Sequence, residues 1–130
     1  MQKNIGLLRE ILHYELVSAQ RYRRFVSVVM VADTRGKGSV DRILSEKVRY
    51  CDVMAAADTT AVIMMSETGS AGAQSAIERY KKDAVDSADL RFSLVTFPHD
   101  GRGVDGLINT GNRRLRKAVE SAPGTVVAAG

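Results

Sequence analysis

Two aspartates lie at positions where carboxylates could take part in metal-assisted chemistry. Asp33 follows a long apolar run, and Asp58 lies between two shorter apolar stretches. Carboxylates in such places can hold divalent cations. Aspartate is also an ordinary turn residue, because its side chain accepts hydrogen bonds from nearby backbone amides. We prefer the turn interpretation for both residues and keep metal ligation as the alternative.

The other reactive side chains form no catalytic set in the sequence. His13 and His99 are far apart, and neither has a nucleophile beside it. Cys51 lacks the histidine partner that would activate it. As the only cysteine, it also excludes an internal disulfide and a multi-cysteine metal site. The methionines at 54, 64 and 65 fall in strand-like stretches and are predicted to be core residues. The sequence therefore indicates no resident cofactor.

Composition favours one compact domain over residues 1–130, with 45% hydrophobic and 26% charged residues. No apolar run is long enough to span a bilayer, and the first residues lack a signal-peptide pattern, so we expect a cytoplasmic protein without membrane contacts. The net charge of +4 is modest for a nucleic-acid binder, so no nucleic-acid partner is expected. The one dense basic run is interpreted as the solvated end of a helix, where cations suit the helix dipole; it comprises Arg113, Arg114, Arg116 and Lys117.

Hydrophobic periodicity predicts the element order α-β-α-β-β-α-β-α. Ser39 is a plausible N-cap of the second helix. This order is that of a ferredoxin-like split βαβ fold, an antiparallel sheet with helices packed on one face, preceded by an N-terminal helix. The predicted helices cover residues 5–22, 39–48, 71–84 and 104–119, and the strands cover 25–32, 52–56, 60–65 and 90–97, with a short edge strand at 125–127.

With these elements in place, the chain resembles a degenerate GGDEF domain, the α/β (α+β) nucleotide-cyclase-type palm of bacterial diguanylate cyclases. Four stretches in the family's order carry the resemblance over nearly the whole length. They are residues 16–24 with the strand that follows, the Arg-x-x-Asp sequence at 49–52, the strand and turn at 94–101, and the terminal helix around 107–118.

Where the family keeps its metal ligands and substrate loop, this sequence departs from the pattern. Active members have Asp-x-Asp at the end of the first strand, where a direct alignment places Ala32 and Thr34, and only a one-residue shift would retain Asp33. The hairpin reads Ala-Ala-Asp-Thr-Thr-Ala-Val at 56–62, without the paired glycines or the acidic pair. The interval between Asp33 and Arg49 is too short for the family's guanine-binding helix and loop. The resemblance therefore implies a domain without diguanylate cyclase activity.

In the family, an Arg-x-x-Asp pair before the hairpin binds cyclic di-GMP, and here that pair is Arg49 and Asp52. Our hypothesis is a catalytically inactive signalling domain that either receives cyclic di-GMP there or serves as a protein-interaction and dimerisation module beside other signalling domains. In the plain alternative the two residues form a surface ion pair, and Cys51 is their half-buried neighbour. A ferredoxin-like nucleic-acid-binding domain and a residual metal-dependent nucleotide enzyme using Asp33 and Asp58 remain the competing functions.

Overall fold

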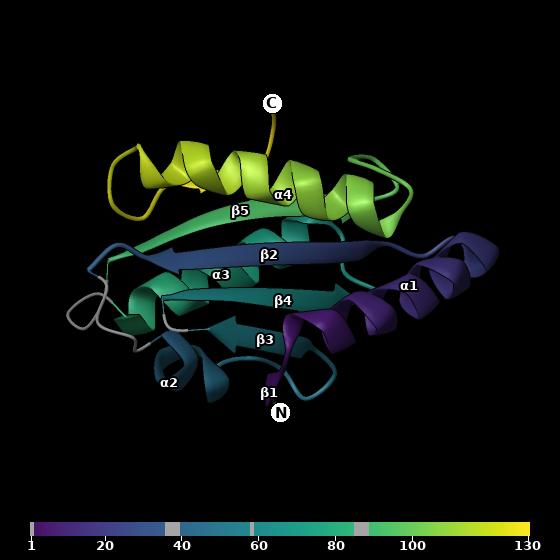
Figure 1. Cartoon of the computed structure of the whole chain (residues 1–130), viewed down its shortest axis with the longest axis horizontal. Helices are drawn as coiled ribbons and strands as arrows, with labels where there is room; N and C mark the ends of the chain where they lie inside the picture. Colours follow the sequence, from purple (N-terminus) through teal and green to yellow (C-terminus); the bar gives the residue numbers. More distant parts are fainter. Residues whose placement is uncertain (1, 36–39, 58, 85–88) are drawn as a thin grey trace.

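The computed structural model describes residues 2–35, 40–57, 59–84 and 89–130. A single sheet of six strands, in the order β1-β3-β4-β2-β5-β6, forms the middle of the molecule (Figure 1). Asp58 and Ser39 lie outside the described residues, as does most of the turn predicted after Asp33. The elements are β1 (Gln2–Lys3), α1 (Ile5–Tyr22), β2 (Val26–Asp33), α2 (Val40–Ser45), β3 (Val53–Ala57), β4 (Thr60–Ser66), α3 (Ser70–Ala84), β5 (Leu90–Phe97), α4 (Val104–Val119) and β6 (Val126–Val127).

The centre of the sheet follows from two long apolar segments. β2 pairs antiparallel with β4 on one side and with β5 on the other. Every residue of β2 and β5 is buried, since both strands are covered on both faces. The order β3-β4-β2-β5 is the ferredoxin-like order, so the predicted fold class is confirmed.

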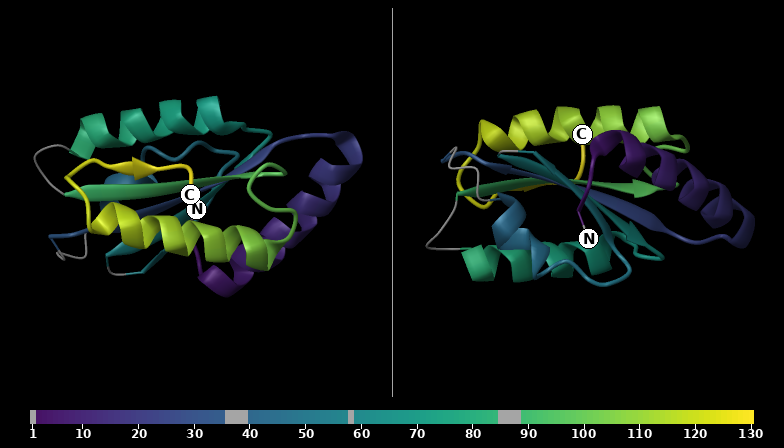
Figure 2. Two further views of the ribbon diagram at one scale, coloured as in Figure 1. Left: turned by 90° about the horizontal axis from the view of Figure 1, so that it is seen from above. Right: turned by 60° about the horizontal axis from the view of Figure 1, so that its bottom comes forward.

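Helices cover both faces of this sheet, so the prediction of helices on one face only is wrong (Figure 2). α2 and α3, the two connections within the split βαβ unit, pack on one face around a core that includes Val29, Val31 and Tyr80. α1 and α4 cover the other face, around Val28, Met30 and other apolar residues. The inward faces of α1 and α4 are apolar at helical spacing, and a helix with such a stripe must bury it against another layer. The three strand methionines are buried, as predicted.

The predicted boundaries hold best for the long elements, and the short edge strands differ most. α4 and β5 span the predicted ranges, whereas α2 ends at Ser45 and is shorter than expected. β1 was not predicted, and it pairs parallel with β3. β6 pairs parallel with β5, which returns the C-terminal segment to the sheet. Among the described residues, no helix is both long and apolar enough to cross a membrane.

Candidate functional site

The Arg-x-x-Asp loop connects α2 to β3 and holds its two named residues in different environments. The Asp52 amide donates to the Arg49 carbonyl at 3.0 Å, which closes a tight turn. Arg49 is exposed, whereas Asp52 is only 7% exposed. The surface ion pair of the plain alternative does not occur between these side chains in the described part of the structure, and the Arg49 guanidinium makes no hydrogen bond there. The loop thus presents a free cation beside a sheltered carboxylate.

Electrostatics make Asp52 an unusual residue for a surface loop. Burial raises the pKa of its carboxyl, although a hydrogen bond from the Arg49 backbone and the charges of the Arg49 and Arg79 side chains act in the opposite direction. The Cys51 thiol lies 3.8 Å from Asp52 Oδ1, so it is a weak donor at most. Cys51 is exposed rather than half-buried as predicted. The loop therefore holds a mostly buried carboxylate whose charge is only partly compensated by its hydrogen bonds and by the two nearby arginines.

Helix α3 adds Arg79 and Tyr80 to this site. Arg79 donates from Nη2 to the Lys47 carbonyl at 3.1 Å, and its guanidinium lies 5.4 Å from the centre of the Tyr80 ring. Tyr80 is fully buried, and its hydroxyl has no hydrogen-bond partner. Burial, together with the charge of Asp52, raises the pKa of Tyr80 to about 12. Arg79 was missed because, in sequence, it is one of many charged residues on an amphipathic helix.

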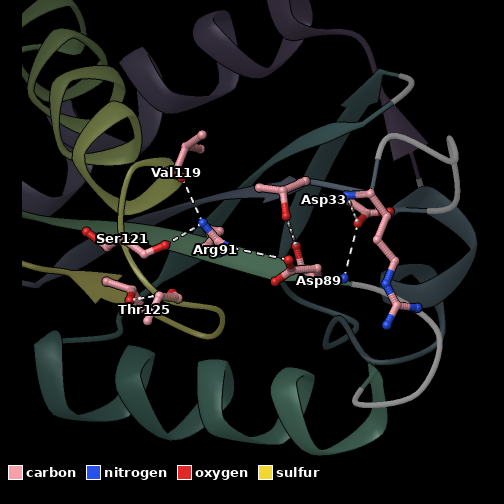
Figure 3. A network of polar contacts seen from close by, with 9 residues as sticks. Asp33, Asp89, Arg91, Val119, Ser121 and Thr125 are labelled. Atoms are coloured by element: carbon pink, nitrogen blue, oxygen red, sulfur yellow. Dashed lines mark hydrogen bonds and ion pairs between the residues drawn. The ribbon is translucent and has the colours of Figure 1, made fainter.

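Asp33, the last residue of β2, has a structural role in a turn. Its Oδ1 accepts from the amides of Arg35 at 3.0 Å and Asp89 at 3.1 Å. Figure 3 shows these contacts, which join the end of β2 to the residue that precedes β5. The turn interpretation of Asp33 therefore agrees with the geometry, while Oδ2 is buried without a partner.

A buried arginine continues this network toward the C-terminal helix. Arg91 Nη1 donates to the carbonyls of Val119 at 2.7 Å and Ser121 at 2.6 Å, and Nη2 contacts Asp89 Oδ2 at 3.2 Å (Figure 3). These bonds satisfy the carbonyl of the last residue of α4, which has no partner within the helix, and one carbonyl of the segment that follows. The network holds the C-terminus of α4 against β5, and nothing in the sequence indicated it.

The residues at the end of β2 do not fit a pair of divalent cations. The Ala32 side chain has no donor atom, and the Thr34 hydroxyl is bonded to the Asp89 carbonyl at 3.3 Å. No cluster of three or more His, Cys, Asp or Glu side chains that could hold a metal occurs within the described ranges. Asp33 already uses Oδ1 for two backbone amides. Among the described residues, the end of β2 therefore offers Asp33 as a single carboxylate whose Oδ1 is already bonded.

The basic run of α4 is not uniformly solvated, so that prediction is wrong for one member. Arg114 is 5% exposed; it donates to the Leu94 carbonyl at 2.8 Å and pairs with Asp100 Oδ1 at 3.0 Å. Asp100 Oδ2 also accepts from the Thr96 amide at 2.9 Å. The other three basic residues are exposed. Arg114 thus ties α4 to β5 and to the turn that follows it.

No family model matches the sequence, and no curated protein matches it. Solved structures do resemble the fold, and the GGDEF domain of TpbB (YfiN) from Pseudomonas aeruginosa superposes with a TM-score of 0.88 at 15% identity, covering 99% of this chain and 91% of that one. The fold is that of a GGDEF domain.

Two further similar structures support this conclusion. The active GGEEF domain of a diguanylate cyclase from Vibrio cholerae has a TM-score of 0.84 at 11% identity, covering 98% of this chain and 97% of that one. The P. aeruginosa diguanylate cyclase SiaD, solved with its activator SiaC, has a TM-score of 0.82 at 16% identity, covering 98% of this chain and 59% of that one. At such identities the likeness establishes a GGDEF-like fold and leaves activity to be argued from residues.

Proposed function

We propose that this chain is a catalytically inactive GGDEF-like signalling domain that receives cyclic di-GMP at Arg49 and Asp52. The observation that carries the proposal is the free Arg49 guanidinium beside the buried Asp52 carboxylate, on the loop that precedes the β3–β4 hairpin. A receptor of this kind would work in the cytoplasm, alone or beside other signalling domains.

The chemistry of the two side chains matches the edge of a guanine base. An arginine fork can donate to both O6 and N7 of guanine, and a carboxylate can accept from its N1 and N2 hydrogens. Arg79 supplies a second cation near Asp52 and could face a phosphate of the same ligand. Because Asp52 is mostly buried, we expect the base edge to reach its carboxylate only where the loop opens to solvent.

The residues at the catalytic positions support the loss of cyclase activity. Alanine and threonine stand at positions 32 and 34, where active members have carboxylates, and Asp33 is held by backbone amides. The hairpin lacks paired glycines, so alanine side chains would obstruct the approach of substrate phosphates to the backbone. We therefore expect no turnover of GTP with Mg²⁺ or Mn²⁺. Turnover that disappears in Asp33→Ala would contradict this part of the proposal.

Isothermal titration of cyclic di-GMP into the purified chain tests the receptor role. We expect a dissociation constant in the micromolar range or below, weakened at least tenfold by Arg49→Ala. Arg116→Ala is the matched control, because that residue is an exposed arginine on α4, far along the chain from the loop. The absence of heat at millimolar ligand, or equal loss in the control, would refute the receptor role.

A protein-interaction module is the second candidate function. SiaD, which shares this fold, was solved in complex with a protein activator. Exposed apolar side chains on α1, such as Tyr14 and Val17, favour a protein contact in this chain as well. By contrast, helices cover both faces of the sheet, so the described strands leave no open platform on which nucleic-acid bases could stack.

A further inference from the structure

A pocket of about 300 Å³ opens at one end of the sheet, between the end of α1 and the turn that follows β5. Both segments lie at the right-hand end of the molecule in Figure 1. Three arginines line this pocket: Arg23 and Arg24 directly follow α1, and Arg102 belongs to the turn. We call it the arginine pocket. It shares no lining residue with the loop at 49–52, which leads into β3 on the far side of β4.

Two of the three cations have no counterion of their own. Arg24 pairs through Nε with Glu67 Oε1 at 3.2 Å. Arg23 and Arg102 are exposed, and their guanidinium groups make no hydrogen bond or ion pair with the residues that the structure describes. Basic side chains after a helix can bind its last carbonyls, but here the Ala19 carbonyl accepts backbone amides, from Arg23 and from Arg24 at 2.8 Å. The two guanidinium groups are therefore available to an anion.

The backbone of Arg23 gives a second reason to look for a role of its side chain. This residue is in the left-handed region, with φ 55° and ψ 49°. The position after a helix that takes this conformation usually holds glycine, because a Cβ makes it unfavourable. An arginine here makes the fold less stable than a glycine would, and such outliers gather at functional sites.

The remaining walls of the arginine pocket are mostly aromatic and apolar. Phe97 is buried and Pro98 is partly buried, and both line it. Phe25 also lines it and is 54% exposed. Its ring packs on Gly69, where an added Cβ would lie 3.6 Å from Phe25 Cδ2. The fold thus holds an exposed aromatic ring beside the free arginines, and a flat ring can stack on it.

We propose that the arginine pocket binds a small anion joined to a flat ring, of the size of a nucleoside monophosphate. The guanidinium groups of Arg23 and Arg102 hold the phosphate, and the ring stacks against Phe25. A volume of about 300 Å³ is at the lower end for small-molecule sites and suits one ring and one phosphate better than a dinucleotide. The site is independent of the receptor role proposed for Arg49 and Asp52.

Titration of adenosine monophosphate into the 130-residue chain, followed by two-dimensional NMR of the backbone amides, tests the proposal. Adenine lacks the O6 acceptor and the N1 hydrogen of guanine, so it does not match the Arg49–Asp52 pair. We expect a dissociation constant between about 10 μM and 1 mM, with the largest shifts at residues 23–25 and 102–103. Adenosine and inorganic phosphate each carry one half of the ligand and should bind at least tenfold more weakly.

Four variants locate the site. Arg102→Ala and Arg23→Gly should each weaken binding of the nucleotide at least tenfold. Glycine suits the left-handed backbone, so Arg23→Gly should melt at or above the wild-type temperature, and unfolding then cannot explain its loss of binding. Arg116→Ala, at an exposed arginine of α4 outside the pocket, and Arg49→Ala should leave the dissociation constant unchanged.

Three results would each overturn the proposal. They are the absence of amide shifts at about 10 mM nucleotide, equal affinity for inorganic phosphate, and binding that is lost in Arg49→Ala but kept in Arg102→Ala. Because the titration contains no cyclic di-GMP, its failure would leave the receptor role of the loop at 49–52 to its own test.

Discussion

At the residue scale, the clearest energetic feature is the ion pair between Arg114 and Asp100, which the fold buries. Removing one partner of a buried pair leaves an uncompensated charge and costs about 3–5 kcal/mol. We expect Arg114→Leu to lower the free energy of unfolding by about 3 kcal/mol, measured by urea denaturation at pH 7. Arg116→Ala, on the exposed side of the same helix, should change it by less than about 0.5 kcal/mol. A loss as small as in the control would show that the pair contributes little.

The same pair gives a prediction for acid stability. Burial alone would raise the pKa of Asp100, but the hydrogen bonds from Arg114 and the Thr96 amide outweigh it and lower the pKa. A lowered pKa in the folded state stabilises the protein above the unfolded value of about 3.9, and this contribution is lost as pH falls through the folded pKa. The stability difference between the wild type and Asp100→Asn should therefore shrink between about pH 5 and pH 2 in urea titrations. A difference that stays constant over that window would contradict this reading.

Asp52 is expected to behave in the opposite way. Because burial raises its pKa, the folded state favours the protonated carboxyl. The contribution of this group to stability is therefore fully present below the unfolded pKa of about 3.9 and is lost as pH rises through the folded value. Asp52→Asn should therefore have a higher melting temperature than the wild type at pH 7, and this difference should be smaller at pH 4. The same substitution should abolish ligand binding. A lower melting temperature at pH 7 would indicate that the carboxylate is a structural anchor rather than a binding group.

At the scale of elements, two glycines of α4 allow a paired test of helix packing. A Cβ added at Gly106 would meet nothing within 4 Å, whereas one at Gly111 would lie 2.8 Å from Met30 Cε. Gly106→Ala should stabilise the domain by about 0.5–1 kcal/mol, because alanine favours helix and restricts the unfolded chain. Gly111→Val should destabilise it by about 1–3 kcal/mol through overpacking against β2. Urea denaturation of both variants separates the two effects, and a stabilising Gly111→Val would show that α4 can move away from the sheet.

How far the sequence predicts each element depends on where the stabilising contacts come from. β5 and α4 were located correctly, because local apolar pattern and turn residues determine them. β1 was missed, since two residues carry no pattern and the strand exists only through pairing with β3. The second helical layer was also missed, because the split βαβ order does not say where the flanking helices pack.

The candidate site shows the same division between local pattern and tertiary contact. The Arg-x-x-Asp spacing is visible in the sequence, but the burial of Asp52 and the approach of Arg79 depend on α3 packing beside the loop. Arg114 was interpreted as solvated because its partner lies 14 residues away and is brought near only by the turn after β5. Charged residues of a predicted helix are indistinguishable in sequence until the fold supplies a buried partner.

At the scale of the whole molecule, the two hydrophobic cores share one sheet, and this arrangement should make the domain a single cooperative unit. β2 contributes Val29 to the core under α3 and Val28 to the core under α4, so neither core can lose its strands without exposing the other.

Ile77→Ala on α3 and Leu107→Ala on α4 both remove fully buried side chains and should each cost about 2–5 kcal/mol. Because the two sites lie on opposite faces, their effects should add within about 0.5 kcal/mol in the double variant. Calorimetry should show one transition for all of these proteins, with equal calorimetric and van't Hoff enthalpies. Two separate transitions, or a transition whose temperature does not change when one of the two faces is destabilised, would mean that the faces unfold independently. Residues 1–130 would then not be one domain.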